Sequence, residues 1–396
     1  MQATKSVFPG SIMVFAGIIA LSCASAPAHA RGLVQRKAEP NVTAYIRTWP
    51  LDSDGETYWT ADMIHGEYLS EIIIAFALID QNDKSSIYIS DGDPAKLWTE
   101  LASLKARLPH LKVKLSVGGW GAEFSDTAAD PDTRAAFIAN VCNWLKTHDL
   151  DGVDIDWEYP VGPEWGQEIK SRPEDRENFI ALLSELRTAL DAQGAHLGKR
   201  YGLSACIPAS AWYVTQNDVL AIAAMVDNLK LMAYDYYGAW SSTTGHLANL
   251  RNNPADPAWG GWSTEQAVNV YLNAGVPPEK IVLGLSFYGR AWAGVNHGET
   301  NGLFQNYTSA VSDAFSWLQI KKLIEEDSTY TRYWDNSAQA PYLYNGDIFI
   351  TYTDPQAIAL IAAYAKEKGL GGVMVWEYAY DIQGDLFKVL NEHVEK

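Results

Sequence analysis

Residues 151–160 read DGVDIDWEYP, and this stretch is the most informative pattern in the chain. Acidic residues occupy every second position, Asp154, Asp156 and Glu158, with apolar residues between them. Because side chains on a strand point alternately to opposite faces, the three carboxylates share one face and the apolar residues share the other. Such an acidic face is ordinary on a solvated antiparallel strand. On a strand enclosed in a parallel barrel, such an acidic face indicates a functional site.

The rest of the chain repeats a strand and helix rhythm around this stretch. Apolar β-type runs occur at 42–46, 72–78, 113–117, 153–157, 202–207, 229–234, 281–287 and 372–376. Helical patterns lie between most of them, at 95–108, 133–147, 176–192, 219–225, 265–273 and 355–367. This alternation predicts parallel strands with right-handed crossovers, and eight repeats predict an α/β fold of the (β/α)8 TIM barrel type. An open doubly wound sheet is the alternative, but its G-x-G-x-x-G phosphate loop is absent.

One interval, 291–345, breaks the rhythm. It has helical spacing at 317–324 and short aromatic β-type pieces at 330–334 and 341–344. We interpret it as a small α+β insertion between strands seven and eight, since a structureless loop of that length is uncommon. The predicted organisation is a signal peptide at 1–30 and a catalytic barrel at 31–396 that contains this insertion.

The first thirty residues have the features of a secretory signal. Lys5 is their one charge, an apolar run covers 12–21, and the segment ends in Ala28-His29-Ala30. The apolar run is too short to span a bilayer. Lipid attachment at Cys23 is a rival interpretation, but leucine is missing three positions upstream. We therefore expect a soluble protein that is secreted, or periplasmic in a Gram-negative host.

The composition restricts the partners. The chain has 30 Lys and Arg against 48 Asp and Glu, a formal net charge of -18, which argues against nucleic acid and membrane partners. Its 15 Trp and 21 Tyr indicate a surface that stacks on flat apolar faces such as sugar rings. Cys142 and Cys206 are interpreted as separate buried thiols. We expect a monomer.

The spacing of the acids favours acid–base chemistry over metal binding. Same-face residues on a strand stand about 7 Å apart, whereas a divalent ion holds its oxygens at about 2.0–2.6 Å. No H-E-x-x-H, Cys/His cluster or G-x-S-x-G is present, so no metal, no other cofactor and no serine nucleophile are expected. Like charges in a confined site raise at least one pKa, which makes a proton available for general acid catalysis.

Four motifs together resemble those of the family 18 glycoside hydrolases, the chitinases. The string at 151–158 is similar to the family's D-x-x-D-x-D-x-E signature, SVGGW at 116–120 to its S-x-G-G motif, and MAYD at 232–235 to its M-x-Y-D motif. Trp376 resembles the tryptophan that floors the scissile sugar site. The 291–345 segment resembles the insertion of the branch that deepens its substrate cleft. This resemblance covers nearly the whole chain after the signal.

The resemblance implies roles for the matching residues. Glu158 would protonate the glycosidic oxygen, and Asp156 would stabilise the positive charge that develops on the substrate. Asp154 would share a proton with Asp156. Tyr234 and Asp235 would hold the N-acetyl group of the sugar. The other implied substrate-binding residues are Tyr45, Phe76, Gly118, Gly119, Trp120, Gly121, Tyr159, Met232, Ala233, Trp240, Arg290 and Trp376.

For some of these residues a structural role is an equally good explanation. Core packing accounts for Tyr45 and Phe76 as well as a cleft position does. Gly118 and Gly119 are best explained by the close approach of neighbouring strands.

The expected function is a secreted chitinase that cuts β-1,4 bonds between N-acetylglucosamine units of chitin and chitooligosaccharides. All candidate acids come from one strand, so an opposed nucleophile is missing and a retaining, substrate-assisted mechanism is expected. One alternative is an endo-β-N-acetylglucosaminidase acting on glycoprotein glycans or peptidoglycan. The other is an inactive chitin-binding lectin, but such relatives replace the terminal acid that Glu158 supplies here.

Overall fold

The computed structural model describes residues 41–48, 58–89, 92–162, 169–257 and 262–394. The expected signal peptide at 1–30 lies outside these residues. Within them, no helix combines the length and apolar character that crossing a membrane requires.

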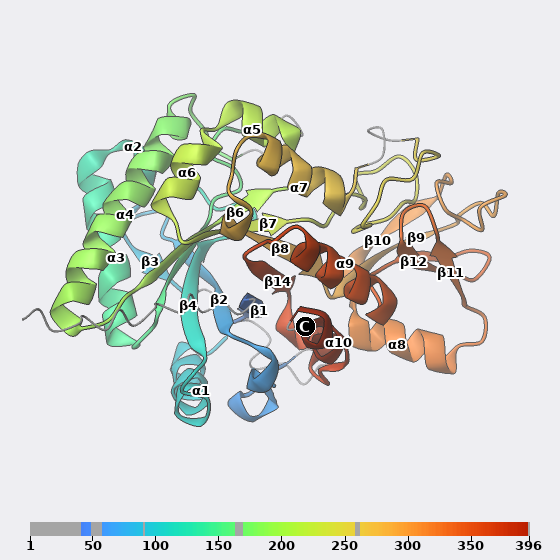
Figure 1. The fold of residues 1–396 in the computed structure, drawn as a ribbon, viewed down its shortest axis with the longest axis horizontal. Helices are drawn as coiled ribbons and strands as arrows, with labels where there is room; N and C mark the ends of the chain where they lie inside the picture. Colours follow the sequence, from blue (N-terminus) through green and yellow to red (C-terminus); the bar gives the residue numbers. More distant parts are fainter. Residues whose placement is uncertain (1–40, 49–57, 90–91, 163–168, 258–261, 395–396) are drawn as a thin grey trace, which may run out of the picture. The chain divides into compact units, whose positions relative to one another are not determined.

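Eight parallel strands form a closed barrel (Figure 1). They are β1 (Asn41–Arg47), β2 (Glu71–Ile79), β4 (Lys112–Gly118), β5 (Gly152–Asp156), β6 (Gly202–Pro208), β7 (Asn228–Met232), β8 (Ile281–Ser286) and β14 (Gly372–Trp376). Each pairs with its neighbours in the order β1-β14-β8-β7-β6-β5-β4-β2, and pairing between β1 and β2 closes the ring. The eight predicted runs are these eight strands, so the predicted TIM barrel is confirmed.

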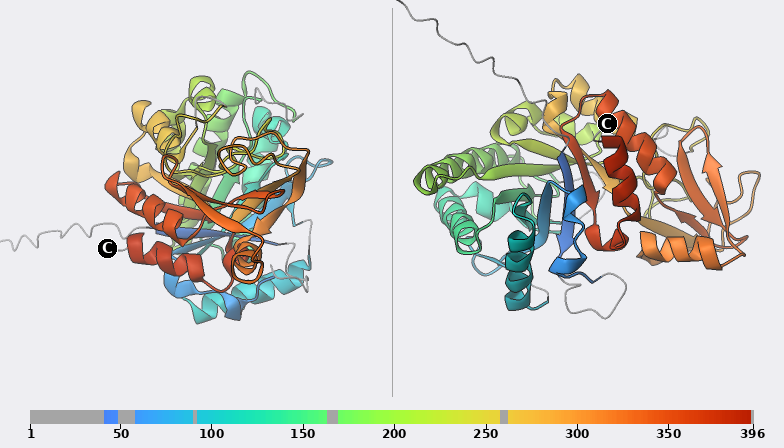
Figure 2. Two further views of the ribbon diagram at one scale, coloured as in Figure 1. Left: turned by 90° about the vertical axis from the view of Figure 1, so that its right-hand side faces the viewer. Right: turned by 60° about the horizontal axis from the view of Figure 1, so that its bottom comes forward.

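Helices follow most of the barrel strands (Figure 2). The six predicted helices are α1 (Pro94–Arg107), α3 (Pro131–Thr147), α4 (Asp175–Leu197), α6 (Val219–Met225), α7 (Thr264–Asn273) and α9 (Pro355–Glu367). The sequence interpretation missed α2 (Ser125–Ala129), α5 (Ala211–Gln216) and α10 (Asp385–Val394), and also a short strand, β3 (Ile87–Tyr88), that pairs with β2. Helices as short as α2 and α5 leave little periodicity to detect. In α10 the buried positions Leu386, Leu390 and Val394 are four residues apart, a spacing typical of a helix with one apolar face.

Three of the outer helices begin with the same Asp-Pro pair. Asp93, Asp130 and Asp354 each accept a hydrogen bond from a backbone N–H of the first turn of α1, α3 and α9. The proline that follows each of them needs no N–H partner at the first helical position. The local sequence thus sets where these helices start.

The two faces of the barrel strands bury different kinds of side chain. On β5, Val153 and Ile155 face outward into the large core between strands and helices. Inside the barrel, Val282 and Met374 belong to a smaller apolar cluster. The remaining interior positions include acids, lysines and hydroxyl groups that form the site described below.

A second, antiparallel sheet lies between β8 and α9 in the chain. Its strands are β9 (Tyr288–Ala293), β10 (Ser309–Ser316), β11 (Thr331–Asp335), β12 (Ala340–Tyr344) and β13 (Phe349–Thr351), in the order β10-β9-β13-β12-β11. Helix α8 (Trp317–Glu326) follows β10 and begins with a capping box of Ser316 and Gln319. The predicted β-type pieces correspond to β11 and β12, whereas β9, β10 and β13 were not predicted. The sheet extends beyond the 291–345 range at both ends. Only Phe287 separates β8 from β9, with no turn residue between them, and β13 ends at Thr351.

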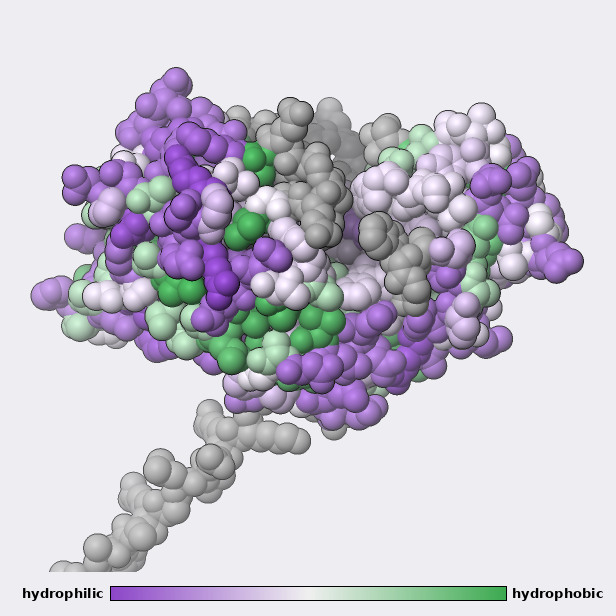
Figure 3. All heavy atoms as spheres, turned by 90° about the horizontal axis from the view of Figure 1, so that it is seen from above, coloured by the Kyte–Doolittle hydropathy of each residue, from purple (hydrophilic) through white to green (hydrophobic). Residues whose placement is uncertain are grey.

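The molecular face drawn in Figure 3 carries mainly hydrophilic residues, with smaller groups of hydrophobic ones between them. The large apolar side chains gather instead in the layer between the barrel and its helices.

Candidate active site

The three acids of β5 and the residues after it lie inside the barrel at increasing height. The exposed fractions are 0% for Asp154, 4% for Asp156 and 9% for Glu158. Trp157 points to the other face, where its ring lies 5.3 Å from Phe124 and 5.6 Å from Phe179, measured between centroids. The alternation predicted from the sequence therefore holds, and the most exposed acid is at the carboxyl end of the strand.

Asp154, the deepest acid, is surrounded by hydrogen-bond donors from three other strands. Its Oδ2 accepts from the Tyr45 hydroxyl at 2.9 Å, the Ser116 hydroxyl at 2.8 Å and the Cys206 thiol at 3.5 Å. Its Oδ1 accepts from the Ser204 hydroxyl at 2.7 Å. Four hydroxyl and thiol groups thus converge on the two oxygens of this carboxyl group. Tyr45 thus faces the acids, while Ser204 and Cys206 were not singled out as site residues from the sequence.

Asp156 differs from Asp154 in its hydrogen-bond partners. Its Oδ1 is buried and has no hydrogen-bond partner among the described residues. Burial raises the pKa of Asp156 well above its ordinary value, and the nearby charges of Glu158 and Asp154 raise it further. Burial and the neighbouring charges therefore favour the protonated form of Asp156, which has a free oxygen for a substrate group.

Glu158 titrates near neutrality. Burial raises its pKa to about 7, a hydrogen bond with the Tyr159 side chain lowers it, and the charge of Asp235 raises it. A carboxyl group with this pKa can donate a proton at neutral pH and can accept one back. Tyr159 is buried, with its ring 5.9 Å from that of Tyr213.

Asp235 follows β7 and is held by residues of β9. Its two oxygens accept from Arg290, Nε to Oδ1 at 2.7 Å and Nη2 to Oδ2 at 2.8 Å, and Oδ1 also accepts from the Tyr288 hydroxyl at 2.7 Å. Burial alone would lower the pKa of Arg290, but Asp235 outweighs it and the pKa is raised. The Arg290 guanidinium lies 4.9 Å from the ring centroid of Trp240. The second sheet therefore fixes a carboxylate at the barrel mouth.

Aromatic rings surround the acids at the carboxyl ends of the strands. Trp376 stacks on Phe76 at 5.6 Å and contacts Tyr45 at 5.8 Å. Trp120 and Trp240 are 64% and 62% exposed, which is far more than core packing leaves. The ring of Tyr234 lies edge-on to that of Tyr288 at 6.3 Å.

The glycines of the SVGGW motif are placed where a side chain would collide. A Cβ on Gly118 would lie 2.1 Å from the backbone oxygen of Asp156, and one on Gly119 would lie 2.8 Å from the Phe76 ring. Both residues, and Gly121, have positive φ angles. Their need for glycine is steric, as the sequence interpretation favoured.

Two further residues of the expected site differ in position. Met232 is half-buried and packs against the apolar cluster inside the barrel. Ala233 is 1% exposed and packs in the core between barrel and helices, so its side chain does not line the open site.

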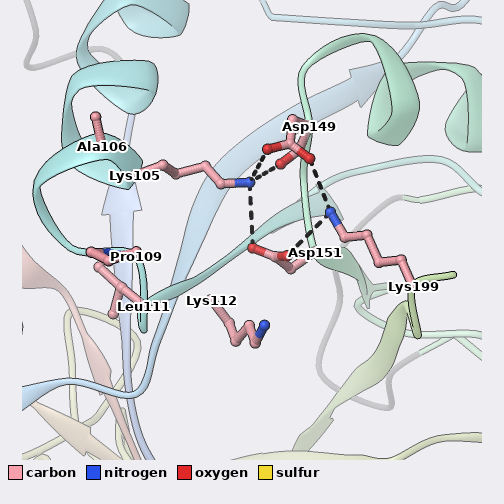
Figure 4. Close-up of a pocket in the computed structure, with 8 residues that line it drawn as sticks. All are labelled: Lys105, Ala106, Pro109, Leu111, Lys112, Asp149, Asp151 and Lys199. Carbon is pink, nitrogen blue, oxygen red and sulfur yellow. Dashed lines mark hydrogen bonds and ion pairs between the residues drawn. The ribbon is translucent and has the colours of Figure 1, made fainter. Parts of the chain in front are cut away.

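A hollow of about 390 Å³ lies at the opposite, amino-terminal end of the barrel strands (Figure 4). Lys105 and Lys199 there pair with Asp149 at 2.8 and 3.2 Å and with Asp151 at 3.7 and 3.2 Å. These charges neutralise one another, and barrel enzymes carry their active sites at the other end. The described residues contain no group of His, Cys, Asp or Glu arranged to hold a metal ion.

The fold and the site together define a (β/α)8 barrel protein with a carboxylate-based site at the carboxyl end of its strands. Residues 41–381 match the family model described as glycosyl hydrolases family 18. The chain belongs to this family.

Named relatives agree with this assignment. The chain is 39% identical to chitinase A1 of Niallia circulans over 75% of this chain, and 30% identical to a probable endochitinase of Caenorhabditis elegans over 85%. It spans 44% and 55% of the lengths of these two relatives. Among solved structures, it is similar to a family 18 N-acetylglucosaminidase from Paenibacillus barengoltzii, with a TM-score of 0.78 and 32% identity, covering 89% of this chain and 99% of that one.

Proposed function

We propose that this protein is a chitinase that hydrolyses β-1,4 bonds between N-acetylglucosamine units of chitin and chitooligosaccharides. The observation that carries the proposal is the contrast among the three acids of β5 and the residues directly after it. Glu158 has a pKa of about 7, Asp156 has a pKa well above its ordinary value, and Asp154 accepts hydrogen bonds from four donors. The names of the relatives support chitin as the substrate class.

In the proposed reaction, Glu158 donates its proton to the glycosidic oxygen while the bond from that oxygen to C1 breaks. The 2-acetamido carbonyl oxygen of the same sugar forms a bond to C1 from the other side, which gives a positively charged five-membered ring. Asp156 accepts the amide N–H and stabilises this ring with its carboxyl group. Water then attacks C1 and gives a proton to Glu158, while the bond from C1 to the acetamido oxygen breaks and restores the N-acetyl group. The two displacements leave the β configuration retained.

The substrate supplies the nucleophile because the available carboxyl groups are badly placed. In the described part of the chain, the carboxyl groups whose charge acts with that of Glu158 are Asp156 and Asp235. Asp156 lies only two residues before Glu158 in the chain, and Asp235 is already bound by Arg290 and Tyr288. Most retaining glycosidases instead use two opposed carboxyl groups about 5–5.5 Å apart, and these residues do not provide that arrangement.

The surrounding residues position the sugars in this proposal. Trp376 forms the floor of the scissile site, and the exposed rings of Trp120 and Trp240 stack on neighbouring sugars. Tyr234 and Asp235 orient the N-acetyl group. The second sheet, from Tyr288 to Thr351, contributes Arg290 and forms one wall of the cleft.

Two measurements on the purified protein test the mechanism. Proton NMR of freshly cleaved chitin hexamer should show the β-anomer first, because two displacements at C1 restore its configuration. An oligomer whose scissile-site sugar lacks the N-acetyl group should remain intact. An α-anomer at the earliest time, or rapid cleavage at glucosamine, would contradict the substrate-assisted mechanism.

The similarity to an N-acetylglucosaminidase of nearly the same length supports a second candidate activity. Incubation with chitin polymer, chitooligosaccharides, glycoprotein and peptidoglycan separates the two. Release of short oligomers from chitin supports the chitinase, whereas release of N-acetylglucosamine alone, or of glycans from glycoprotein, supports the alternative. Tight binding of oligomers without any release would support a lectin.

Two further expectations belong to the same proposal. Secretion to the outside or the periplasm rests on the signal-like segment at 1–30 and would place the protein where chitin occurs. Size-exclusion chromatography with light scattering should give the mass of a monomer.

A further inference from the structure

A cluster of three charged side chains fills the barrel interior below the catalytic acids. Glu71 of β2 pairs with Lys114 of β4, Oε2 to Nζ at 2.6 Å, and with Lys230 of β7, Oε1 to Nζ at 2.9 Å. The Lys230 ammonium also donates to the Thr43 hydroxyl at 2.9 Å. The exposed fractions of these side chains are 8% for Glu71, 5% for Lys114 and 0% for Lys230. The strands thus enclose an ion cluster that the sequence interpretation did not anticipate.

The charges within this cluster do not cancel. One carboxylate faces two ammonium groups, which leaves one positive charge in excess. Burial alone would raise the pKa of Glu71, but Lys114 and Lys230 outweigh it and lower the pKa to about 2. Burial lowers the pKa of Lys230, while the charges of Glu71 and Asp154 oppose this effect. A buried excess charge is costly unless another group compensates it.

Asp154 is the acid whose negative charge can compensate this excess positive charge. Lys230 is paired in register with Cys206 of β6, so both side chains point into the barrel. The Cys206 thiol in turn lies 3.5 Å from Asp154 Oδ2. With Asp154 included, two carboxylates balance two ammonium groups. Another acid, Asp227, interacts with Lys114, but it already binds Arg200 and the backbone N–H of Leu203.

We propose that Lys230 is a positioning residue for the catalytic acids: its ammonium is the counter-ion that keeps the negative charge on Asp154, so that the exchangeable proton stays on Asp156. This inference rests on the proposed function, in which Asp156 and Glu158 act on the substrate. The buried ion cluster in the lower half of the barrel then sets the charge of the acids above it as well as filling space.

The other groups that face Asp154 cannot supply a compensating positive charge. Burial raises the pKa of Tyr45 and of Cys206 well above their ordinary values, so both are neutral donors across the working range of pH. Ser116 and Ser204 carry no charge. The strands β8 and β14 contribute Val282 and Met374 to the interior cluster. In the described part of the chain, the cationic side chains of the barrel interior are therefore Lys114 and Lys230.

The proposal predicts a change in the pH profile when the charge is removed. Lys230→Gln keeps a hydrogen-bond donor for Glu71 but loses the positive charge. Both limbs of the kcat/KM profile should then move to higher pH, by about one unit, because nearby acids hold their protons more tightly without the cation. A purely structural role would lower the maximum of the profile and leave both limbs in place.

Two variants provide the matched comparisons. Lys199→Gln makes the same substitution at the barrel rim, where the side chain is 25% exposed and pairs with Asp149 and Asp151, and its limbs should stay within about 0.2 pH units of the parent because solvent screens the charge. The double variant Glu71→Gln/Lys230→Gln again has one positive charge in excess, on Lys114. Its limbs should return most of the way to those of the parent.

The outcomes separate the possible explanations. Unmoved limbs in Lys230→Gln, or an equal shift in Lys199→Gln, would overturn the proposal. If Lys230→Gln does not accumulate as folded protein, Lys114→Gln removes the other cation of the cluster and should shift the limbs in the same direction. Absence of hydrolysis by the unaltered protein would instead overturn the proposed function, so the two failures are distinguishable.

Discussion

Asp154, Asp156 and Glu158 are equivalent in the sequence pattern, but each meets a different environment in the barrel. Asp154 receives four hydrogen bonds, Asp156 has an unpartnered oxygen, and Glu158 is next to Tyr159 and Asp235. The different properties of the three acids therefore come from the side chains around them. Substitution of each of these side chains can test its contribution.

At the scale of one residue, Glu158→Gln should lower kcat on chitin hexamer by about 10²–10⁴-fold, because the amide keeps the shape but cannot donate a proton. The dissociation constant for the oligomer, measured by calorimetry, should stay close to that of the parent. Glu123→Gln, at a more exposed carboxylate that pairs with Lys84 at 3.7 Å, is the control and should retain full activity. Activity of Glu158→Gln within a few-fold of the parent would remove Glu158 from the acid role.

The pH dependence should follow from the pKa of Glu158. A general acid must carry its proton, so kcat/KM should fall as the pH rises through about 7. The negative charge of Asp235 raises this pKa, so Asp235→Asn should move the basic limb to lower pH. A limb that stays in place, even with a weaker reaction, would show that Asp235 acts only in binding.

At the scale of an element, Asp354 joins two parts of the fold. It caps α9 by accepting from the N–H of Ala357 at 2.9 Å, and it binds Arg332 of β11 at 2.6 and 2.9 Å. Its side chain is 6% exposed. The start of a barrel helix and a strand of the second sheet are therefore held by one carboxylate.

Asp354→Ala should lower the free energy of unfolding by about 2 kcal/mol, at the upper end of what losing a helix cap costs. Asp93→Ala removes the exposed cap of α1 and should cost only about 1 kcal/mol. Thermal or denaturant unfolding of both variants checks the difference. If the two losses are equal, the contact with Arg332 contributes nothing to stability.

At the scale of the whole molecule, the ion cluster of Glu71 makes stability depend on acid pH. The pKa of Glu71 is about 2 in the folded protein and 4.5 in its ordinary state. Because the folded value is lower, the contribution is complete above pH about 4.5 and is lost as the pH falls toward 2, up to about 3 kcal/mol. Melting temperatures between pH 6 and 2 should fall steeply for the parent and less steeply for Glu71→Gln. Parallel curves would mean that Glu71 does not couple folding to protonation.

Much of this fold follows from local patterns. Alternation of apolar and acidic residues placed Asp154, Asp156 and Glu158 on one face, and eight apolar runs with helices between them predicted the barrel. These features depend on the direction of successive side chains, which the chain sets within a few residues. The Asp-Pro pairs at the helix starts are local for the same reason.

Local sequence patterns are enough to predict the strands, the main helices and the row of acids. Which side chains meet those acids depends on how the chain folds in three dimensions. Lys230 lies 187 residues from Thr43, Tyr45 lies 109 from Asp154, and Arg290 lies 55 from Asp235. Such contacts arise when the barrel closes and its strands take their register, and no local periodicity encodes either event. The charge balance inside the barrel is therefore a property of the closed ring of strands.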